Sequence, residues 1–232
     1  MKRAVFAIAF IGILTACKKE PTGNLIIEGS INGLNKGTLY IQQLQDTVLV
    51  AIDSVELRGS SQFTTSIDID SPEMLYLFLD RGVTNTIDNN LMFFAEPGKI
   101  NINTDLKTFY AGANITGSKN QDLYEEYKKV DARFAEKDLE LTQEELLAFK
   151  ENRVAETQLE REANLRRKYL HAINFALNNK EYEIAPYIAL AEIPDANVKY
   201  LDTIQKSMSE KVANSKYGKM LTKHIAELKQ AN

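Results

Sequence analysis

The sequence predicts an α+β protein: an N-terminal antiparallel β-sandwich or open barrel, followed by a helical segment, behind a signal peptide. Apolar and polar residues alternate over residues 24–117, which is the pattern of strands with one buried face. From residue 118 onward apolar residues recur every three or four positions, as on one face of a helix. Because the strands precede the helices, this order favours α+β over a doubly wound parallel sheet.

The first 16 residues predict a bacterial export signal. Lys2 and Arg3 give a basic start, and residues 4–14 form an apolar run. That run is shorter than the roughly 20 residues that a membrane-spanning helix needs, so it fits the apolar region of a signal peptide. The run ends in four residues that resemble the lipobox of bacterial lipoproteins: Leu14, Thr15, Ala16 and Cys17.

Cys17 is the predicted lipidation and cleavage point, with Leu14, Thr15 and Ala16 recognised by the signal peptidase. Several acyl chains on one cysteine, at about 0.8 kcal/mol per buried CH₂, give durable anchoring. Residues 17–23 would then form a lipidated polar tether. An ordinary secretory signal with a chance cysteine and an uncleaved membrane anchor are the alternative interpretations. The leading one is a lipid-anchored cell-envelope protein of the outer membrane, facing either the periplasm or the cell surface.

The predicted β-sandwich domain, residues 24–117, contains about eight short strands at a spacing typical of sandwiches and barrels. Residues that tolerate positive φ separate them, as at Gly33 and Gly37. Seven of these strands are assigned to runs of residues: 25–31, 38–44, 48–57, 63–69, 74–79, 91–95 and 100–103.

The predicted helical domain, residues 118–232, begins with a capping box at residues 118–121. A charged break is expected at residues 136–141. A second capping box at residues 142–145 would then open a long polar helix that runs to about residue 178. Shorter helices are expected over residues 183–193, over 197–208, and from 209 or 215 to 229.

The composition argues against several functional classes. One cysteine in 232 residues cannot form an internal disulfide, a CxxC redox pair or a cysteine-rich zinc site. A net charge of −4, with no basic block beyond the N-terminus, argues against nucleic-acid binding. The sequence contains neither a GxSxG motif nor a phosphate-binding glycine loop, so we expect no enzyme activity, no cofactor and no metal.

The remaining candidates for chemistry have a structural interpretation as well. His171 and His224 lie on separate predicted helices without metal-ligand spacing, which favours packing or surface roles. Acidic pairs such as Glu125-Glu126 would allow glycoside hydrolysis, but nothing in the sequence selects a catalytic pair. Several aromatic residues could line an apolar ligand groove, although a core role is favoured for them: Tyr40, Tyr76, Phe78, Phe93 and Phe94.

The β-rich part resembles a domain of unknown function found in lipoproteins of Gram-negative bacteria. The residues that carry the resemblance are 26–34, 37–41, 53–55, 63, 72–76, 92–98 and 115–118, with a further helical stretch at 214–219. In such proteins a helical segment and then a thioredoxin-like redox domain commonly follow. We expect no redox domain in this protein, because the sequence stops where that domain would begin and its one cysteine is the predicted lipidation site. The resemblance therefore implies no thiol–disulfide activity here.

Four functions remain open at this stage. The leading one is a non-catalytic binding or scaffold module that docks an envelope protein, such as a separate redox protein. The second is a lipoprotein that binds a small ligand or glycan, with Glu96-Pro97-Gly98 and the loop at residues 80–90 as the rim of its site. A hydrolase and a degenerate relative of a redox lipoprotein are the other two.

The lipidation site gives the first prediction. A Cys17→Ala variant should be released from membranes or left unprocessed, while its folded body stays unchanged. Membrane fractionation, the mass of the mature chain and circular dichroism would check this. A variant that stays membrane-bound at the mature mass would contradict the assignment, and so would the loss of a measurable thiol activity.

Overall fold

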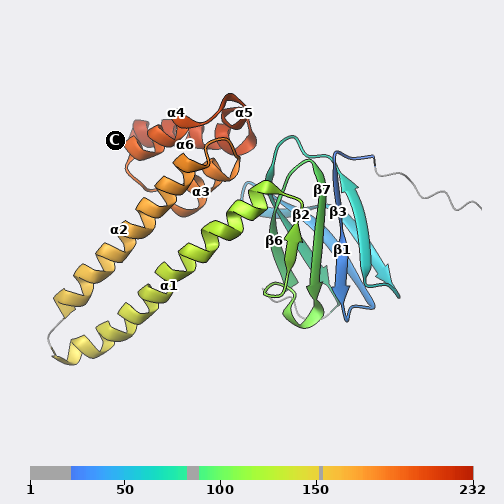
Figure 1. The fold of residues 1–232 in the computed structure, drawn as a ribbon, viewed down its shortest axis with the longest axis horizontal. Helices are drawn as coiled ribbons and strands as arrows, with labels where there is room; N and C mark the ends of the chain where they lie inside the picture. Colours follow the sequence, from blue (N-terminus) through green and yellow to red (C-terminus); the bar gives the residue numbers. More distant parts are fainter. Residues whose placement is uncertain (1–21, 83–88, 152–153, 232) are drawn as a thin grey trace, which may run out of the picture.

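The computed structural model describes residues 22–82, 89–151 and 154–231. Within these residues the strands come first and the helices follow, which confirms the predicted α+β class (Figure 1). The strands are β1 (Leu25–Asn32), β2 (Lys36–Gln45), β3 (Val48–Arg58), β4 (Gln62–Ile67), β5 (Glu73–Asp80), β6 (Asn90–Ala95), β7 (Gly98–Asp105) and β8 (Asn114–Thr116).

The strands form two four-stranded sheets that pack face to face. One sheet has the order β4-β1-β7-β8 and the other has the order β3-β2-β5-β6. Along strands such as β7, the side chains between the sheets alternate with outward polar ones, which is why the sequence shows period two there. This first core includes Leu25, Ile27, Leu39, Leu77 and Ile100, all fully buried.

One strand pair departs from the predicted antiparallel arrangement. β1 and β7 run parallel, with Gly29 opposite Ile102. A parallel neighbour requires a long connection, and here the entire second sheet lies between the two strands in sequence. Gly29 allows the close approach, because a Cβ there would lie 1.7 Å from the carbonyl oxygen of Ile102.

The sheet that carries β5 and β6 is apolar on both faces. Leu75, Leu77 and Phe93 point into the sandwich, whereas Met74 and Phe94 belong to a second core shared with the helices. A strand buried on both faces reads as a continuous apolar run, as residues 74–79 do. The second core therefore attaches the helical segment to the outer face of this sheet.

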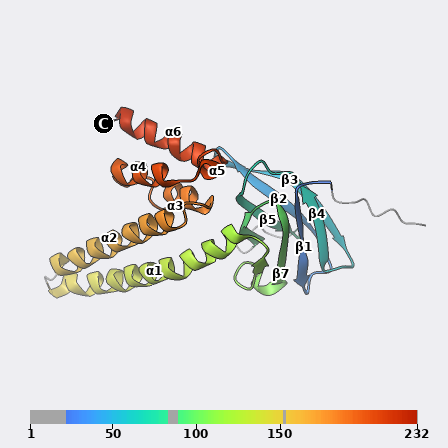
Figure 2. The same cartoon turned by 45° about the horizontal axis from the view of Figure 1, so that its top comes forward.

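The helical segment consists of a long hairpin with shorter helices packed at its base (Figures 1 and 2). The hairpin helices, α1 (Lys119–Glu151) and α2 (Val154–Asn178), run side by side away from the sandwich. The shorter helices are α3 (Ile184–Glu192), α4 (Val198–Ser207), α5 (Glu210–Ala213) and α6 (Lys216–Ala231).

The predicted second capping box is wrong. Thr142 lies inside α1, where its Oγ1 donates to the carbonyl oxygen of Asp138 at 2.8 Å. The charged stretch at residues 136–141, where a break was expected, is helical as well. Arg161 of α2 stabilises this part of α1 by contacts to Asp138, Thr142 and Glu145 at 2.6–3.3 Å. Leu141 is buried between these charged neighbours. The predicted last helix is divided into α5 and α6, with Ser209 and Ser215 as their caps.

The helices also complete hydrogen bonds that the sheet leaves open. The backbone N–H of Met74 donates to the hydroxyl of Tyr217 on α6 at 2.9 Å, in a buried position. Beside it, the buried carboxylate of Glu73 forms an ion pair with Lys216 and accepts from Gln43 Nε2 at 2.7 Å. The second core thus contains polar contacts as well as apolar packing.

The Tyr217 hydroxyl gives the second prediction. Tyr217→Phe removes the acceptor of a buried N–H and should lower the free energy of unfolding by about 1–3 kcal/mol. Urea unfolding would measure the change, with Tyr200→Phe as a control because Tyr200 is 49% exposed. Equal stability of the two variants would contradict a structural role for this bond.

Candidate functional site

The start of α1 is fixed by groups from the sandwich as well as by its own cap. Ser118 Oγ accepts from the backbone N–H of Gln121 at 3.0 Å, as the sequence predicts. The carboxylate of Glu96, in the turn between β6 and β7, accepts from the N–H groups of Lys119 at 2.8 Å and Asn120 at 3.3 Å. A carboxylate at a helix N-terminus is stabilised by the free N–H groups and the helix dipole.

The Gln121 half of the predicted capping box is wrong. The Gln121 side chain does not return to the cap residue; its Oε1 accepts from the backbone N–H of Phe94 at 2.7 Å. β6 is an edge strand, so its outward N–H groups need a partner from outside the sheet. Gln121 supplies that partner and joins α1 to the sheet.

Asn120 connects three elements through one buried amide. Its Nδ2 donates to Glu96 Oε2 at 2.8 Å and to Glu183 Oε2 at 3.1 Å, and its Oδ1 accepts from the N–H of Ile184 at 2.9 Å. Only 2% of the residue is exposed. Both donors and the acceptor of the amide are therefore used between the β6–β7 turn, α1 and the start of α3.

Glu183 is the most buried acidic residue of this junction, at 1% exposure. Besides the bond from Asn120, its Oε1 lies 3.0 Å from Nζ of Lys211 on α5. The Lys211 side chain is 72% exposed. A buried carboxylate thus has a solvent-exposed cation as its counter-ion.

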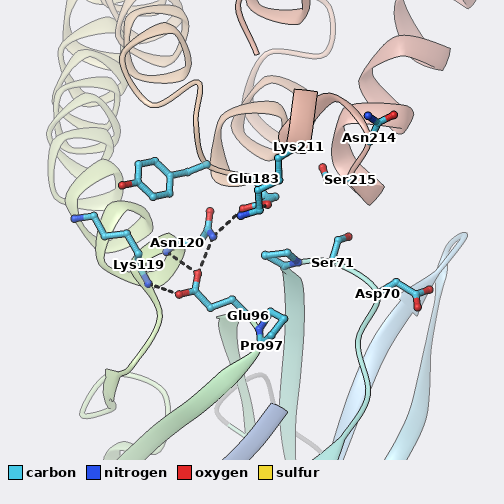
Figure 3. Close-up of a pocket in the computed structure, with 12 residues that line it drawn as sticks. Asp70, Ser71, Glu96, Pro97, Lys119, Asn120, Glu183, Lys211, Asn214 and Ser215 are labelled. Carbon is cyan, nitrogen blue, oxygen red and sulfur yellow. Dashed lines mark hydrogen bonds and ion pairs between the residues drawn. The ribbon is translucent and has the colours of Figure 1, made fainter. Parts of the chain in front are cut away.

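These groups line a polar cleft of about 490 Å³ between the sandwich and the helices. Figure 3 shows Ser71, Glu96 and Pro97 on the sandwich side, facing Asn120, Glu183, Lys211 and Ser215 on the helical side. Asp70, Lys119, Tyr182 and Asn214 also line it. The cleft can bind a polar ligand, because hydroxyl, amide, carboxylate and ammonium groups all reach it.

A second, more apolar groove of about 720 Å³ also borders the contact between sandwich and helices. Tyr76, Tyr187, Leu190, Tyr217 and Met220 line it, next to the end of the β2–β3 hairpin. Burial raises the pKa of Tyr187 to about 12 and raises that of Tyr217 as well. A tyrosine hydroxyl is protonated at neutral pH even at its ordinary pKa of about 10, and the raised pKa of these two extends that state to higher pH, so both can donate hydrogen bonds.

The structure tests only part of the predicted sites. Leu14, Thr15, Ala16 and Cys17 lie outside the described residues. Of the predicted rim, Glu96 and Pro97 do line the polar cleft. The other rim loop, residues 80–90, lies partly outside the described residues, and its described part lines neither hollow.

The two histidines and the five aromatic residues do not form a single site. His171 stacks on Tyr127 with ring centroids 5.1 Å apart, and burial lowers its pKa. His224 contacts the carbonyl oxygen of Pro194 at 2.6 Å and lines the apolar groove. Phe93 and Phe94 are core residues, Tyr40 stacks on Phe78, and Tyr76 lines the apolar groove.

The described residues contain neither a cluster suited to a metal ion nor a membrane-spanning helix. Among residues 22–82, 89–151 and 154–231, no group of three or more His, Asp or Glu is placed to hold a metal ion. None of the helices in these ranges is long and apolar enough to cross a membrane.

Sequence reasoning missed Asn120, Glu183 and Lys211. Asn120 falls in the predicted capping box and Lys211 in or just before the predicted last helix, and neither position indicates a long-range contact. Glu183 directly precedes the strongly apolar α3. Its position as a cap residue is the one sequence signal that could have indicated a role for it at this junction. The contacts themselves span 24 to 64 residues of sequence, and no local pattern reports such pairs.

The fold defines an α+β protein in which a two-sheet sandwich carries a helical segment on one outer face. Residues 25–124 match the family described as Domain of unknown function (DUF4369), so this part of the chain is a domain of that family. The match covers all the strands and continues into the start of α1. No curated protein and no solved structure matches the chain.

The Asn120 amide gives the third prediction. Asn120→Asp keeps the shape but places a carboxylate against Glu96 and Glu183, so a buried charge loses its compensation. The free energy of unfolding should fall by on the order of 3 kcal/mol.

Urea unfolding against pH would measure this effect. The new carboxyl should have a raised pKa in the folded state, so the stability of the variant relative to the wild type should fall as pH rises. Asn114→Asp is the control, since Asn114 is exposed on β8. A pH-independent difference would contradict the network as described.

Proposed function

We propose that this protein is a membrane-anchored lipoprotein of the cell envelope that acts as a non-catalytic binding or scaffold module. The observation that carries the proposal is the polar cleft, whose walls come from both the sandwich and the helical segment. Neither the sandwich nor the helical segment alone forms this cleft, so the site exists only when the two are packed together.

The rigidity of the walls supports a binding role. Asn120, Glu96 and Gln121 are held by hydrogen bonds that cross between the sheet and the helices. A site whose groups are already fixed loses less conformational entropy when a partner binds. The basic start, apolar run and lipobox at residues 14–17 support the membrane anchor.

The leading partner is a separate envelope protein. The resemblance of the sequence to lipoproteins that carry a thioredoxin-like domain supports a redox protein as that partner. In this interpretation the lipid on Cys17 holds the body at the membrane, and the cleft holds the partner.

A small-ligand or glycan-binding lipoprotein is the second candidate, and the apolar groove favours it. Its volume falls in the range of small-molecule sites, about 300–1,000 Å³. Three tyrosines, Tyr76, Tyr187 and Tyr217, each with a pKa that burial raises, would supply both aromatic faces and hydroxyl donors to a ligand there.

In-cell crosslinking gives the fourth prediction. A photo-crosslinking residue at Asn214, on the cleft rim, should trap an envelope protein in intact cells, and mass spectrometry would identify it. The same residue at Met220 reports on the apolar groove, and at Asn114, which is exposed on β8 and lines neither hollow, it serves as the control.

The outcomes separate the two candidates. A protein trapped from Asn214 but not from Asn114 supports the scaffold function. No protein trapped from either hollow, together with a thermal shift on adding a glycan that Tyr76→Ala abolishes, would support the second candidate instead. Absence of both results would contradict a binding function.

A further inference from the structure

The polar cleft contains one group whose electrostatic partner is exchangeable. Glu183 Oε2 is held by Asn120, whereas the only contact described for Oε1 is the ion pair with Lys211. No hydrogen bond of good geometry reaches Oε1 from the described residues, although the atom is buried. A buried carboxylate is costly unless a cation and hydrogen-bond donors satisfy it.

Lys211 is a weakly held counter-ion. Its side chain is 72% exposed and extends from α5, a helix of four residues. An ion pair to such a side chain is weakened by solvent and by the loss of side-chain freedom. A competing cation that enters the cleft therefore displaces the Lys211 ammonium group at a small cost in free energy.

The other charges around the cleft are consistent with a cationic ligand. Three acidic residues line it, Asp70, Glu96 and Glu183, against two basic ones, Lys119 and Lys211. The Glu96 carboxylate is already bound by α1 and Asn120, and Asp70 has no ion pair with any described residue. If a ligand ammonium displaces Lys211, the remaining lining is acidic overall.

We propose that the cleft binds a protonated primary amine, with its ammonium group against Glu183 Oε1 in the place of Lys211 Nζ. This rests on the proposed binding function and names the chemistry of its ligand. An ammonium group offers three N–H donors, which matches an acceptor that lacks a well-aligned donor. The amine belongs either to a small molecule or to a lysine of a partner protein.

A matched pair of probes tests the charge. Nα-acetyl-lysine methylamide carries the ammonium group, and its Nε-acetylated form has the same backbone without the charge. Calorimetric titration of the full mature chain should detect binding of the first and at least about tenfold weaker binding of the second, the loss expected for hydrogen bonds to a charged group. Equal affinity for the two probes would overturn the proposal.

The direction in which Lys211→Ala changes the affinity for the cationic probe is the decisive test. Removing the internal competitor should strengthen binding of the cationic probe by up to about fivefold, the factor that an exposed ion pair supports. Lys206→Ala is the matched control, because its side chain is 75% exposed and pairs with Asp202 outside the cleft. If Lys211 instead binds an anionic ligand, its removal leaves the cationic probe no better bound, and that result would overturn the proposal.

Glu183→Gln should abolish binding of the cationic probe, and circular dichroism would check its folding. If this variant does not fold, the gain in Lys211→Ala still decides the matter, since that change leaves the Asn120 network intact. Glucosamine and N-acetylglucosamine repeat the charge comparison with a small molecule. Tighter binding of glucosamine than of the lysine probe assigns the amine to a small ligand, and the reverse assigns it to a partner lysine.

Amine binding and crosslinking from Asn214 together separate the amine site from the proposed binding function. If neither amine binds but a protein is still trapped from Asn214, the cleft is a docking site of different chemistry. If no amine binds and nothing is trapped, both proposals are wrong.

Discussion

The buried amide of Asn120 is the interaction on which the joined body depends. One of its donors goes to Glu96 in the β6–β7 turn, while its other donor and its acceptor go to Glu183 and Ile184 at the start of α3, so the amide joins α1 to both places. A shift of any of these elements would leave a buried polar group without its partner, and such groups are expensive in a low-dielectric interior. The amide thus fixes where the helical segment lies against the sandwich.

The apolar contact beside the Asn120 amide stabilises the association of the sandwich with the helical segment, whereas the polar contacts fix their relative orientation. Phe94 packs edge-to-face against Tyr187 and Tyr217, with ring centroids 5.6 and 6.0 Å apart. Aromatic packing of this kind tolerates small displacements, because it is distributed over many weak contacts. Hydrogen bonds such as Met74 N–H to Tyr217 are directional and select one arrangement.

The two hollows are a consequence of this way of joining. The outer face of a twisted sheet and a group of short helices touch over a limited area, so space remains at the edges of the contact. On one edge the residues are polar and include Glu183 and Lys211; on the other they include Tyr76 and Met220. The same contact that stabilises the body therefore generates both candidate sites.

Local patterns were sufficient for part of the site. Ser118 was recognisable as a cap because a serine just before a helical repeat accepts a nearby N–H. Glu96 and Pro97 were expected at a rim because turns carry exposed side chains. The same reasoning failed at Gln121 and Thr142, since each side chain has a partner or neighbour that is distant in sequence.

The sequence by itself determined the order of strands and helices, the apolar faces, and the signals at residues 1–17 that predict a lipid anchor. These follow from periodicity and composition, which are properties of adjacent residues. Only the tertiary structure decided that β1 and β7 run parallel, that Asn120 joins three elements, and that Glu183 is buried beside an exposed lysine. Those features depend on residues far apart in the chain, and their energies arise only when folding removes them together from water.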